Sequence, residues 1–407
     1  MNILFLTLLE MDVSSKQGGL YTDLVKEFLK NGHYIYAINP NISPDPASKS
    51  NSKNIIKQDK LTLVNLNVKN HLLNGPIKKG VHRLLIGRKY LFAIKKFFEH
   101  IKFDLVLYST PPITFNAIIK YLKKKDQTKS YLMLKDIFPQ NALDLKMLHT
   151  TGLSGFIYRY FLKIEKDLYN ISDYIGCMSP ANVEYLKKNY QLNHKTVEIL
   201  PNTITPSPPI EKHPQLINTI RQQYGLPLDK KILVYGGNLG KPQGIDFLNK
   251  CCMECNNDSF YFVIAGSGTE TYKIQEMVSK NTKGNVNFLG NLPMAEFERL
   301  LLACDLGLIF LDHRFTIPNF PSRLLSYMQA QLPILAVTDP VTDLGRIIVD
   351  SKLGYWCESG QIDHFNQTLN RVILENNLPS IGKNARQFLE KNYTSTHAYS
   401  IIMKHFD

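Results

Sequence analysis

Short apolar runs alternate with longer amphipathic segments along most of this chain of 407 residues. The runs that we expect to form strands are, in chain order, "NILFLTLL", "YIYAIN", "LTLVNLN", "DLVLYST", "SYLMLKD", "DYIGCMS", "VEILPN", "KILVYGG", "YFVIAG", "VNFLG", "LGLIFL" and "PILAVT". Strands that alternate with helices form parallel sheets covered on both faces. Because the pattern occurs in two series, we predict two α/β domains, each with its own parallel sheet.

The two series are separated by a proline-rich stretch, "PNTITPSPPIEKHPQ" (residues 201–215). Proline fits neither a helix interior nor a central strand, so we place the domain boundary here. The first domain then covers residues 1–203 and the second residues 204–385. The final segment, residues 386–407, has a helical pattern that allows it to cross back to the first domain. The polar residues 41–60 predict a flexible loop.

Charge is distributed unevenly between the two halves. Residues 1–203 contain 29 Lys and Arg against 16 Asp and Glu, whereas residues 204–407 contain 19 of each kind, so the whole excess of +13 lies in the first half. Much of it falls in "KKGVHRLLIGRKYLFAIKKFFEHIK", where cations alternate with apolar residues. Such a segment suits an anionic membrane surface, and a solvated helix face is the alternative. The expected membrane contacts are Arg88, Lys89, Lys95 and Lys96.

Other classes of protein find little support. No nucleic-acid-binding motif accompanies the charge, and no window has the roughly 20 apolar residues that span a bilayer. The opening "MNILFLTLLEMD" lacks a leading basic segment and is typical of a buried strand rather than a signal peptide. Six cysteines in a chain of this length indicate a reducing cytoplasm. Cys252 and Cys255 have no second ligand pair, so "CCMEC" favours a helix face over a metal site.

Open parallel sheets bind ligands at the carboxyl ends of their strands, so we expect the site in a cleft between the two sheets. Gly18 and Gly19 follow the first strand and precede a helix, where backbone N–H groups suit a phosphate, although a simple turn is equally compatible. No G-x-G-x-x-G fingerprint is present, which argues against a nicotinamide enzyme. At the corresponding turn of the second domain, "YGGNLGKPQG" places Lys241 beside glycines that admit a diphosphate.

Two further strands of the second domain end in small or polar residues, where a nucleoside can lie against the backbone. The residues of this expected donor site are Gly237, Asn238, Gly266, Ser267, Gly290 and Asn291. The stretch "PNFPSRLLSYMQAQLPILAVTD" then predicts a turn into an amphipathic helix with Pro321 in its first turn. Asn319, Ser322 and the helix N-terminus would face a diphosphate, and Arg323 adds a bidentate partner.

One loop of the first domain carries a candidate acid–base group. Pro139 prevents the strand in "LKDIFPQNALDL" from continuing, which leaves Asp136, Gln140 and Asn141 on a loop at the strand's carboxyl end. Asp136 can accept a proton from an acceptor hydroxyl or orient that hydroxyl. A helix cap is the alternative role for this residue.

These motifs, in this order and over nearly the full length, resemble the retaining glycosyltransferases of family four. That family has the GT-B fold of two Rossmann-like domains, and "DIFPQNALDL" with "IPNFPSRLLSYM" is similar to bacterial capsule or O-antigen sugar transferases. The family usually has two glutamates, one near the donor sugar and one on the ribose, where this sequence has Pro318 and Ser326. Ser326 can still bond a ribose hydroxyl, and Asp312 or His313 can reach the sugar. The family's Arg and Lys in the glycine-rich turn are Asn238 and Gln243 here.

The resemblance implies a metal-independent transfer of a hexosyl or N-acetylaminosugar unit, with retention, from a donor that is most often UDP-linked. Lys241 and Arg323 would stabilise the leaving diphosphate, and no cofactor is expected. The implied acceptor is a polyprenyl-diphosphate-linked saccharide at the inner face of the cell membrane, where we expect the protein to be cytoplasmic and peripheral. A catalytically inactive GT-B scaffold that binds nucleotide sugars is one alternative. A GT-B nucleotide-sugar 2-epimerase is another, although the expected cleft carboxylates and histidines are missing.

Overall fold

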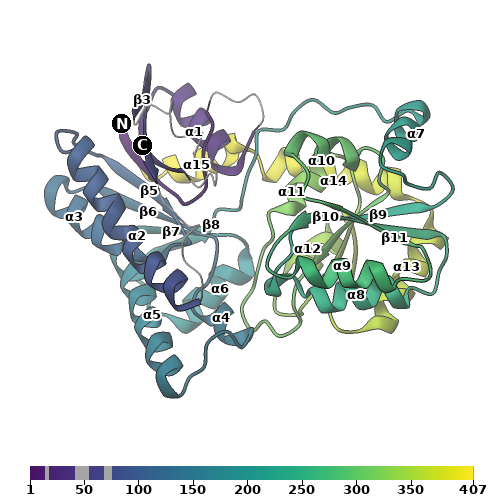
Figure 1. Ribbon diagram of the computed structural model, residues 1–407. Helices are drawn as coiled ribbons and strands as arrows, with labels where there is room; N and C mark the ends of the chain where they lie inside the picture. The colour runs from purple at the N-terminus through teal and green to yellow at the C-terminus, as the bar shows by residue number, and fades with distance from the viewer. Residues whose placement is uncertain (14–17, 42–54, 68–75, 407) are drawn as a thin grey trace. The chain divides into compact units, whose positions relative to one another are not determined.

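The computed structural model describes residues 1–13, 18–41, 55–67 and 76–406, and we analyse those residues (Figure 1). The chain forms two compact units, which are treated separately below. Unit 1 contains Met1–Thr205 and Ser395–Asp407, and unit 2 contains Pro206–Thr394. Of the expected final segment 386–407, residues 386–394 therefore belong to unit 2, and the part that follows belongs to unit 1. None of the described helices is long and apolar enough to cross a membrane.

Unit 1 is built on an eight-stranded sheet in the order β3-β4-β2-β1-β5-β6-β7-β8. Its strands are β1 (Asn2–Leu6), β2 (Tyr34–Asn41), β3 (Ile55–Gln58), β4 (Leu61–Asn67), β5 (Leu105–Ser109), β6 (Lys129–Leu134), β7 (Tyr174–Cys177) and β8 (Thr196–Ile199). All neighbours pair in parallel except β3, which is antiparallel to β4. The strands β1 and β5 are buried almost throughout because helices cover both faces.

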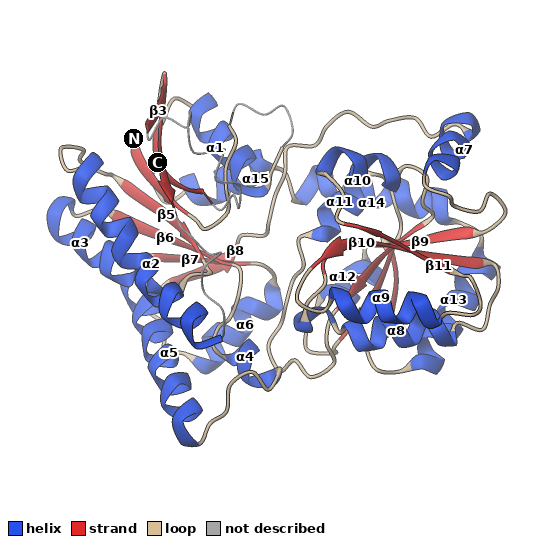
Figure 2. Ribbon diagram, viewed as in Figure 1, coloured by secondary structure: helices blue, strands red, loops and turns tan. Residues whose placement is uncertain are grey.

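Helices cover both faces of this sheet (Figure 2). The helices of unit 1 are α1 (Leu20–Lys30), α2 (Pro76–Phe97), α3 (Asn116–Asp126), α4 (Gln140–Asp144), α5 (Gly152–Ile171), α6 (Pro180–Asn189) and α15 (Ser395–Met403), with a 3-10 turn at Ile113–Phe115. Helices α1 and α15 share one core with β1, β2, β5 and β6. Helix α3 packs between α2 and α5.

Unit 2 has a six-stranded, wholly parallel sheet in the order β11-β10-β9-β12-β13-β14. The strands are β9 (Lys231–Asn238), β10 (Phe260–Ser267), β11 (Val286–Gly290), β12 (Leu306–Phe310), β13 (Ile334–Thr338) and β14 (Gly354–Glu358). The helices are α7 (Pro214–Gln223), α8 (Ile245–Glu254), α9 (Thr271–Lys280), α10 (Met294–Leu301), α11 (Arg323–Gln329), α12 (Leu344–Asp350), α13 (Ile362–Glu375) and α14 (Leu378–Asn392), with a 3-10 turn at Lys241–Gln243. Apolar residues of α8, α9 and α13 form one core with the sheet.

The strand order locates a switch point in each unit. Numbered along the chain, β9 to β14 have the order 3-2-1-4-5-6, and unit 1 has the same order, extended by a seventh strand, β8, if its antiparallel strand β3 is left out. The order reverses between β9 and β12 in unit 2 and between β1 and β5 in unit 1. Ligands of such sheets bind beside this reversal, at the carboxyl ends of the strands. The loops after β9 and β12 touch there, because the Asp312 N–H donates to the Pro242 carbonyl over 3.0 Å.

The two-sheet α/β fold and all twelve expected strands are confirmed. Two strands were not expected. The first, β3, replaces the end of the predicted 41–60 loop, whose residues 42–54 lie outside the described part of the chain; the second is β14. The six cysteines are free and buried, and Cys251 and Cys252 pack in the core from α8. Among the described residues, no group of His, Cys, Asp and Glu is arranged to hold a metal.

Candidate functional site

A frame of close-packed glycines forms the carboxyl ends of β9 and β10. Gly237 and Gly266 pair across the two strands, and so do Asn238 and Ser267. A Cβ on Gly266 would lie 1.9 Å from the Gly237 carbonyl oxygen, and Gly237 itself has a φ of +111°. A side chain is therefore excluded at position 266, where a ligand would meet the backbone itself.

Arg323 lies beside this glycine frame. Its guanidinium carbon is 4.3 Å from the centre of the Tyr235 ring, and its Nη2 would be 3.7 Å from a Cβ on Gly237. The Nη1 atom is buried and makes no hydrogen bond to the described residues. Stacking on an aromatic face orients a guanidinium while leaving its N–H groups available to an anion. Arg323 was predicted to bind the donor diphosphate; it lies beside the glycine frame of unit 2, and its contact with a diphosphate stays a prediction.

Tyr327, which the sequence did not single out, connects α11 to the sheet. Its hydroxyl accepts the Gly236 N–H over 3.1 Å and lies 3.0 Å from the Leu308 and 3.2 Å from the Val234 carbonyl oxygens. The residue is four positions after Arg323, on the same side of the helix. Tyr327 thereby fixes the second half of α11 against the middle of β9 and β12.

Lys241 begins the 3-10 turn after β9, with its side chain exposed and unpaired within the described chain. Ser322 is exposed just before α11, and Ser326 is half-buried one turn into that helix. The helix begins at Arg323, two residues later than a start at Pro321 would give, and it has seven residues. Lys241 and Ser322 thus lie on the two connections that flank the switch point of unit 2, and Arg323 is the first residue of the helix that follows.

The two positions at which cations were expected from the family resemblance are bonded to each other. The Asn238 side-chain amide donates to Gln243 Oε1 over 2.9 Å. This bond bridges the turn that contains Gly240 and Lys241, and the Asn238 carbonyl accepts the Tyr235 hydroxyl over 2.8 Å. An uncharged, hydrogen-bonded pair therefore stands where the family usually has two cations, and it holds the shape of the turn. We call the Asn238–Gln243 pair the neutral clasp.

Asp312, a candidate for contact with the donor sugar, is paired with an arginine. Its carboxylate accepts two hydrogen bonds of 2.7 Å from the Arg314 guanidinium and one of 3.0 Å from the Arg314 N–H. Burial raises the pKa of Asp312, but the hydrogen bonds and charge of Arg314 outweigh burial and hold it below its ordinary value. A carboxylate engaged in this way is a structural ion pair, so the expected sugar contact of Asp312 is disfavoured. His313 beside it is exposed.

The loop after β13 supplies polar groups next to Pro318, one of the two positions at which the family usually has a glutamate. Asp339 is fully buried, and its Oδ1 accepts the N–H groups of Val341 and Thr342 over 3.0 and 2.9 Å. The Thr342 hydroxyl donates to the Asn319 carbonyl over 2.7 Å, which ties this loop to the segment after the buried Pro318. An aspartate directly after a buried central strand is a signal that sequence reasoning missed.

Three further donor-site candidates are Gly290, Asn291 and Asn319. Gly290 ends β11, the edge strand, with a φ of +70°, and Asn291 follows it in an exposed position. The Asn319 side-chain amide donates to the Ile317 carbonyl over 3.3 Å, so one of its donors is already engaged. These three residues border the carboxyl edge of unit 2, and their contact with a donor stays a prediction.

Asp136 occupies the carboxyl end of β6 in unit 1. The Thr110 hydroxyl oxygen accepts the N–H groups of Lys135 and Asp136 over 3.0 and 3.2 Å, which fixes the backbone of the loop. The Asp136 carboxylate has no hydrogen bond within the described residues, and burial raises its pKa to about 6. Its negative charge also raises the pKa of Tyr21, an effect second to burial of that phenol. A carboxyl with this pKa is suited to take up a proton near neutral pH.

The helix-cap alternative for Asp136 is wrong. Helix α4 begins at Gln140, the residue before it is Pro139, and no side chain caps it. Gln140 belongs to this helix rather than to a loop, and its amide donates to Asp144 and accepts the Tyr158 hydroxyl. Asn141, also in the helix, keeps a buried Oδ1 without a partner in the described chain. The carboxylate of Asp136 is thus left for another role.

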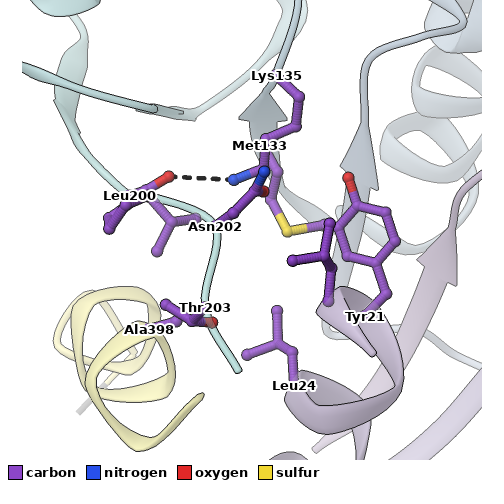
Figure 3. Close-up of a pocket in the computed structure, with 10 residues that line it drawn as sticks. Tyr21, Leu24, Met133, Lys135, Leu200, Asn202, Thr203 and Ala398 are labelled. Carbon is purple, nitrogen blue, oxygen red and sulfur yellow. Dashed lines mark hydrogen bonds between the residues drawn. The ribbon is translucent and has the colours of Figure 1, made fainter. Parts of the chain in front are cut away.

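Lys135, next to Asp136, lines a small cavity of about 10 Å³ together with Tyr21, Asn202 and Thr203 (Figure 3). A space of this size holds about one water molecule. The Lys135 Nζ donates to the Leu200 carbonyl over 3.1 Å, and burial lowers its pKa to about 7. Lys135 and Asp136 therefore form a pair of neighbours that both titrate near neutral pH, which the sequence did not indicate.

Gly18 and Gly19 precede α1 as expected, and Gly19 is its N-cap. A Cβ on Gly18 would lie 2.6 Å from Oδ2 of Asp23, which is buried in the first turn and accepts the Thr205 N–H over 2.7 Å. This negative charge at the helix start disfavours a phosphate there. The donor role of the two glycines stays a prediction, and their observed contact is with Asp23.

The four expected membrane residues, Arg88, Lys89, Lys95 and Lys96, are all exposed on α2. Phe92 lies between them and is 68% exposed. The Lys95 ammonium is 4.8 Å from the centre of the Tyr121 ring on α3. The outer surface of α2 therefore combines cations with one prominent aromatic side chain.

A second, larger cavity of about 800 Å³ lies in unit 2, away from the groups described above. Its lining includes Asp305, Pro333 and Lys231, which lie just before or at the amino ends of β12, β13 and β9. Those are the strand ends opposite to the glycine frame. This cavity therefore adds nothing to the candidate donor site.

Among known proteins, a family match covers one of the two units. Residues 217–388, almost all of unit 2, match the family described as "Glycosyl transferases group 1". The "Probable glycosyltransferase WbjE" of Pseudomonas aeruginosa is 24% identical over 323 residues, which cover 79% of this chain and 78% of the relative.

Solved structures are similar over nearly the whole chain. A sucrose-phosphate synthase from Thermosynechococcus elongatus has a TM-score of 0.74 at 14% identity and covers 99% of this chain and 98% of its own. Anabaena HepE in complex with UDP-glucose has a TM-score of 0.67 at 15% identity, with 100% and 99% covered. At these identities the likeness shows the fold, which is GT-B.

Proposed function

We propose that this chain, which belongs to the family of group 1 glycosyl transferases, transfers a sugar from a nucleoside diphosphate donor to an acceptor hydroxyl. The observation that carries the proposal is Arg323, stacked on Tyr235 beside Gly237 with guanidinium N–H capacity that the described residues do not use. A buried donor without an acceptor is costly, and a diphosphate would supply the acceptor.

In the proposed reaction, the bond between the anomeric carbon and the diphosphate breaks, and a bond to the acceptor oxygen forms on the same face. Negative charge grows on the leaving diphosphate, where Lys241 and Arg323 would stabilise it without an obligatory metal. The acceptor's proton would pass to Asp136 or to the leaving phosphate. Asp136 is proposed for this step because its pKa of about 6 leaves it ionised, and so able to take up a proton, at neutral pH.

The base of the donor is proposed to be uracil, because a solved structure with the same fold holds UDP-glucose. The other donor contacts are proposed to come from the edges of β9 and β10 and from Asn319, Ser322 and Ser326. For the acceptor we propose a lipid-linked saccharide of cell-surface polysaccharide synthesis, in line with the solved lipopolysaccharide glycosyltransferase WaaG and with the basic surface of α2. That surface, with Arg88, Lys89, Lys95 and Lys96, would contact the anionic inner face of the cell membrane.

The test is release of free nucleoside diphosphate from UDP-, GDP-, ADP- and dTDP-sugars, with and without a bacterial lipid extract. One donor should be consumed, faster with lipid, and Lys241→Ala with Arg323→Ala should reduce kcat by about 10³-fold or more, since single oxyanion donors contribute about 10²–10³. Arg371→Ala is the matched control for Arg323, because Arg371 also stacks on a tyrosine, 5.1 Å from the Tyr355 ring. Lys230→Ala, just before β9 at its opposite end, is the control for Lys241.

A nucleotide-sugar-binding protein without turnover is the second candidate. It is favoured by Pro318 and Ser326 at the two glutamate positions and by the engagement of Asp312 with Arg314. Such a protein would be stabilised against heat by one nucleotide and would release no diphosphate from any donor. Turnover therefore separates the two candidates, whereas binding alone does not.

A further inference from the structure

We infer that the first half of helix α5 is an insertion surface for an anionic lipid bilayer. The large apolar side chains Leu153, Phe156, Ile157 and Tyr160 are exposed by 79%, 68%, 41% and 54%. Their spacing of three and four residues places them on one face of the helix, over about two turns. We call these four residues the apolar face of α5.

This face is not a core surface whose partner lies elsewhere in unit 1. Helix α5 contacts α3 and the 3-10 turn at Ile113–Phe115, and its fully buried side chains are concentrated in its second half, at Glu165, Leu168 and Tyr169. Met147, in the turn before the helix, is a further large apolar side chain and is 57% exposed. A run of large exposed apolar side chains of this kind marks an interaction surface.

The charged residues around the apolar face of α5 indicate which kind of partner it contacts. Residues 152–164 of α5 contain Arg159 and Lys163 and no acidic residue, whereas Lys166 beyond them lies between the buried Glu165 and the half-buried Asp167. The Arg159 guanidinium lies 4.8 Å from the centre of the Phe156 ring, so a cation borders the apolar face directly. Apolar side chains below the headgroups with cations at phosphate level are the pattern of a helix that lies in a membrane interface.

The neighbouring helices extend the same chemistry. Helix α3 contacts both α2 and α5 in unit 1. Helix α3 adds four lysines, of which Lys120, Lys124 and Lys125 are exposed, and α2 adds the four cations named above around Phe92. Lys123 and Lys125 are paired with Asp173 and Asp126, and the other exposed cations of α2 and α3 would attract an anionic bilayer. A second copy of the chain packed on the same face would instead bring like charges together.

The inference sharpens the membrane contact proposed above. The basic residues of α2 were the sequence-based candidates, and they supply electrostatic attraction. The apolar face of α5 supplies insertion, which the charge pattern did not reveal. The inference concerns binding and needs no turnover, so a failure of the transferase proposal leaves its test unaffected.

The first measurement is co-sedimentation with vesicles of phosphatidylcholine and phosphatidylglycerol, and with phosphatidylcholine alone. Leu153→Ser with Phe156→Ser should weaken binding to the anionic vesicles by about tenfold or more. The matched control is Leu374→Ser on α13 of unit 2, which removes a leucine that is 83% exposed and should bind as the wild type does. Because all three side chains are exposed, the variants should retain the wild-type circular dichroism and melting temperature.

The second measurement places a reporter on the apolar face. In Phe156→Trp, added anionic vesicles should shift the new tryptophan emission to the blue, and brominated lipid tails should quench it, beyond the signal of the native Trp356 in the unaltered protein. Unchanged sedimentation of the double serine variant, or no quenching, would overturn the inference. So would a wild-type dimer that the double variant abolishes without any vesicle binding.

Discussion

The two sheets of this protein share one strand order and differ in what their carboxyl edges carry. In unit 2 the edge is a glycine frame flanked by Arg323 and Lys241, with a carboxylate, Asp312, that is already paired. In unit 1 the edge carries Asp136 and Lys135, whose pKa values burial brings to about 6 and about 7. The common topology thus supplies two positions for chemistry, and the loops decide that one suits an anion and the other proton transfer.

The largest expected effect comes from adding a side chain to the glycine frame of unit 2. Gly266→Ala would place a Cβ 1.9 Å from the Gly237 carbonyl oxygen, so β9 and β10 must separate. We expect a loss of about 3 kcal/mol or more in the free energy of unfolding, together with loss of nucleotide binding. Urea unfolding and calorimetric titration with UDP measure the two effects.

The control for that substitution is Gly284→Ala. Gly284 also has a positive φ, +60°, but nothing lies within 4 Å of the added Cβ. Its cost should be about 1 kcal/mol, with nucleotide binding unchanged. Equal costs at the two glycines would mean that the frame is not close-packed in the way described.

In unit 1 the corresponding change is Asp136→Asn, which keeps the shape of the side chain and removes its ability to take up a proton. We expect kcat to fall by about 10²–10⁴-fold, with little change in the affinity for the donor. In the wild type, kcat/KM should fall as the pH drops through about 6, because the carboxylate becomes protonated. A rate for Asp136→Asn within threefold of wild type would remove Asp136 from the mechanism.

The same carboxyl predicts a pH-dependent difference in stability. Its pKa in the folded protein lies above the ordinary value of 3.8, so the folded state holds the proton more tightly than the unfolded state does. Ionisation therefore costs stability in full above about pH 6 and not at all below about pH 4. Asp136→Asn should be more stable than wild type by up to about 3 kcal/mol at pH 8, and the difference should shrink towards pH 4.5. A constant difference between these pH values would contradict the raised pKa.

The smallest expected effect concerns the neutral clasp of unit 2. Replacing Asn238 with Arg and Gln243 with Lys removes their 2.9 Å hydrogen bond and adds two cations beside Lys241. The lost bond costs about 1 kcal/mol, and two exposed cations contribute only a little more than that to binding of the diphosphate, so UDP should bind at most about threefold more tightly. Titration calorimetry against wild type decides this, and weaker binding by the variant would show that the shape of the turn matters more than its charge.

Strands that are buried on both faces could be predicted from the sequence, and less buried strands could not. Strands such as β1 and β5 are short, continuous apolar runs, which is what two covered faces require. The edge strands β3, "IIKQ", and β14, "GYWCE", have mixed patterns because neighbouring strands and helices cover them less completely. The apolar residues of α5 show the opposite limit, since a helical repeat of apolar side chains does not reveal whether it faces a core or solvent.

For the candidate sites, the rule that ligands bind at strand ends selected the loops that carry Asp136, Lys241 and Ser322, and their contact with a ligand stays a prediction. The partners of each side chain were not readable, because they are set by contacts between residues far apart in the chain. The stacking of Arg323 on Tyr235 joins positions 88 residues apart, and the Thr110 hydroxyl holds Asp136 from a neighbouring strand. The pairing of Asp312 with Arg314 is local, yet sequence alone left Asp312 as a candidate for the sugar.

The central claim is that the glycine frame and Arg323 of unit 2 bind the diphosphate of a nucleotide sugar. Its most direct test is calorimetric titration of UDP into the wild type, Arg323→Ala and Arg371→Ala. The account predicts that UDP binds the wild type and Arg371→Ala alike, and that Arg323→Ala weakens binding by about tenfold or more, as loss of a charge-assisted contact should. Equal affinity for UDP in all three proteins would contradict the account.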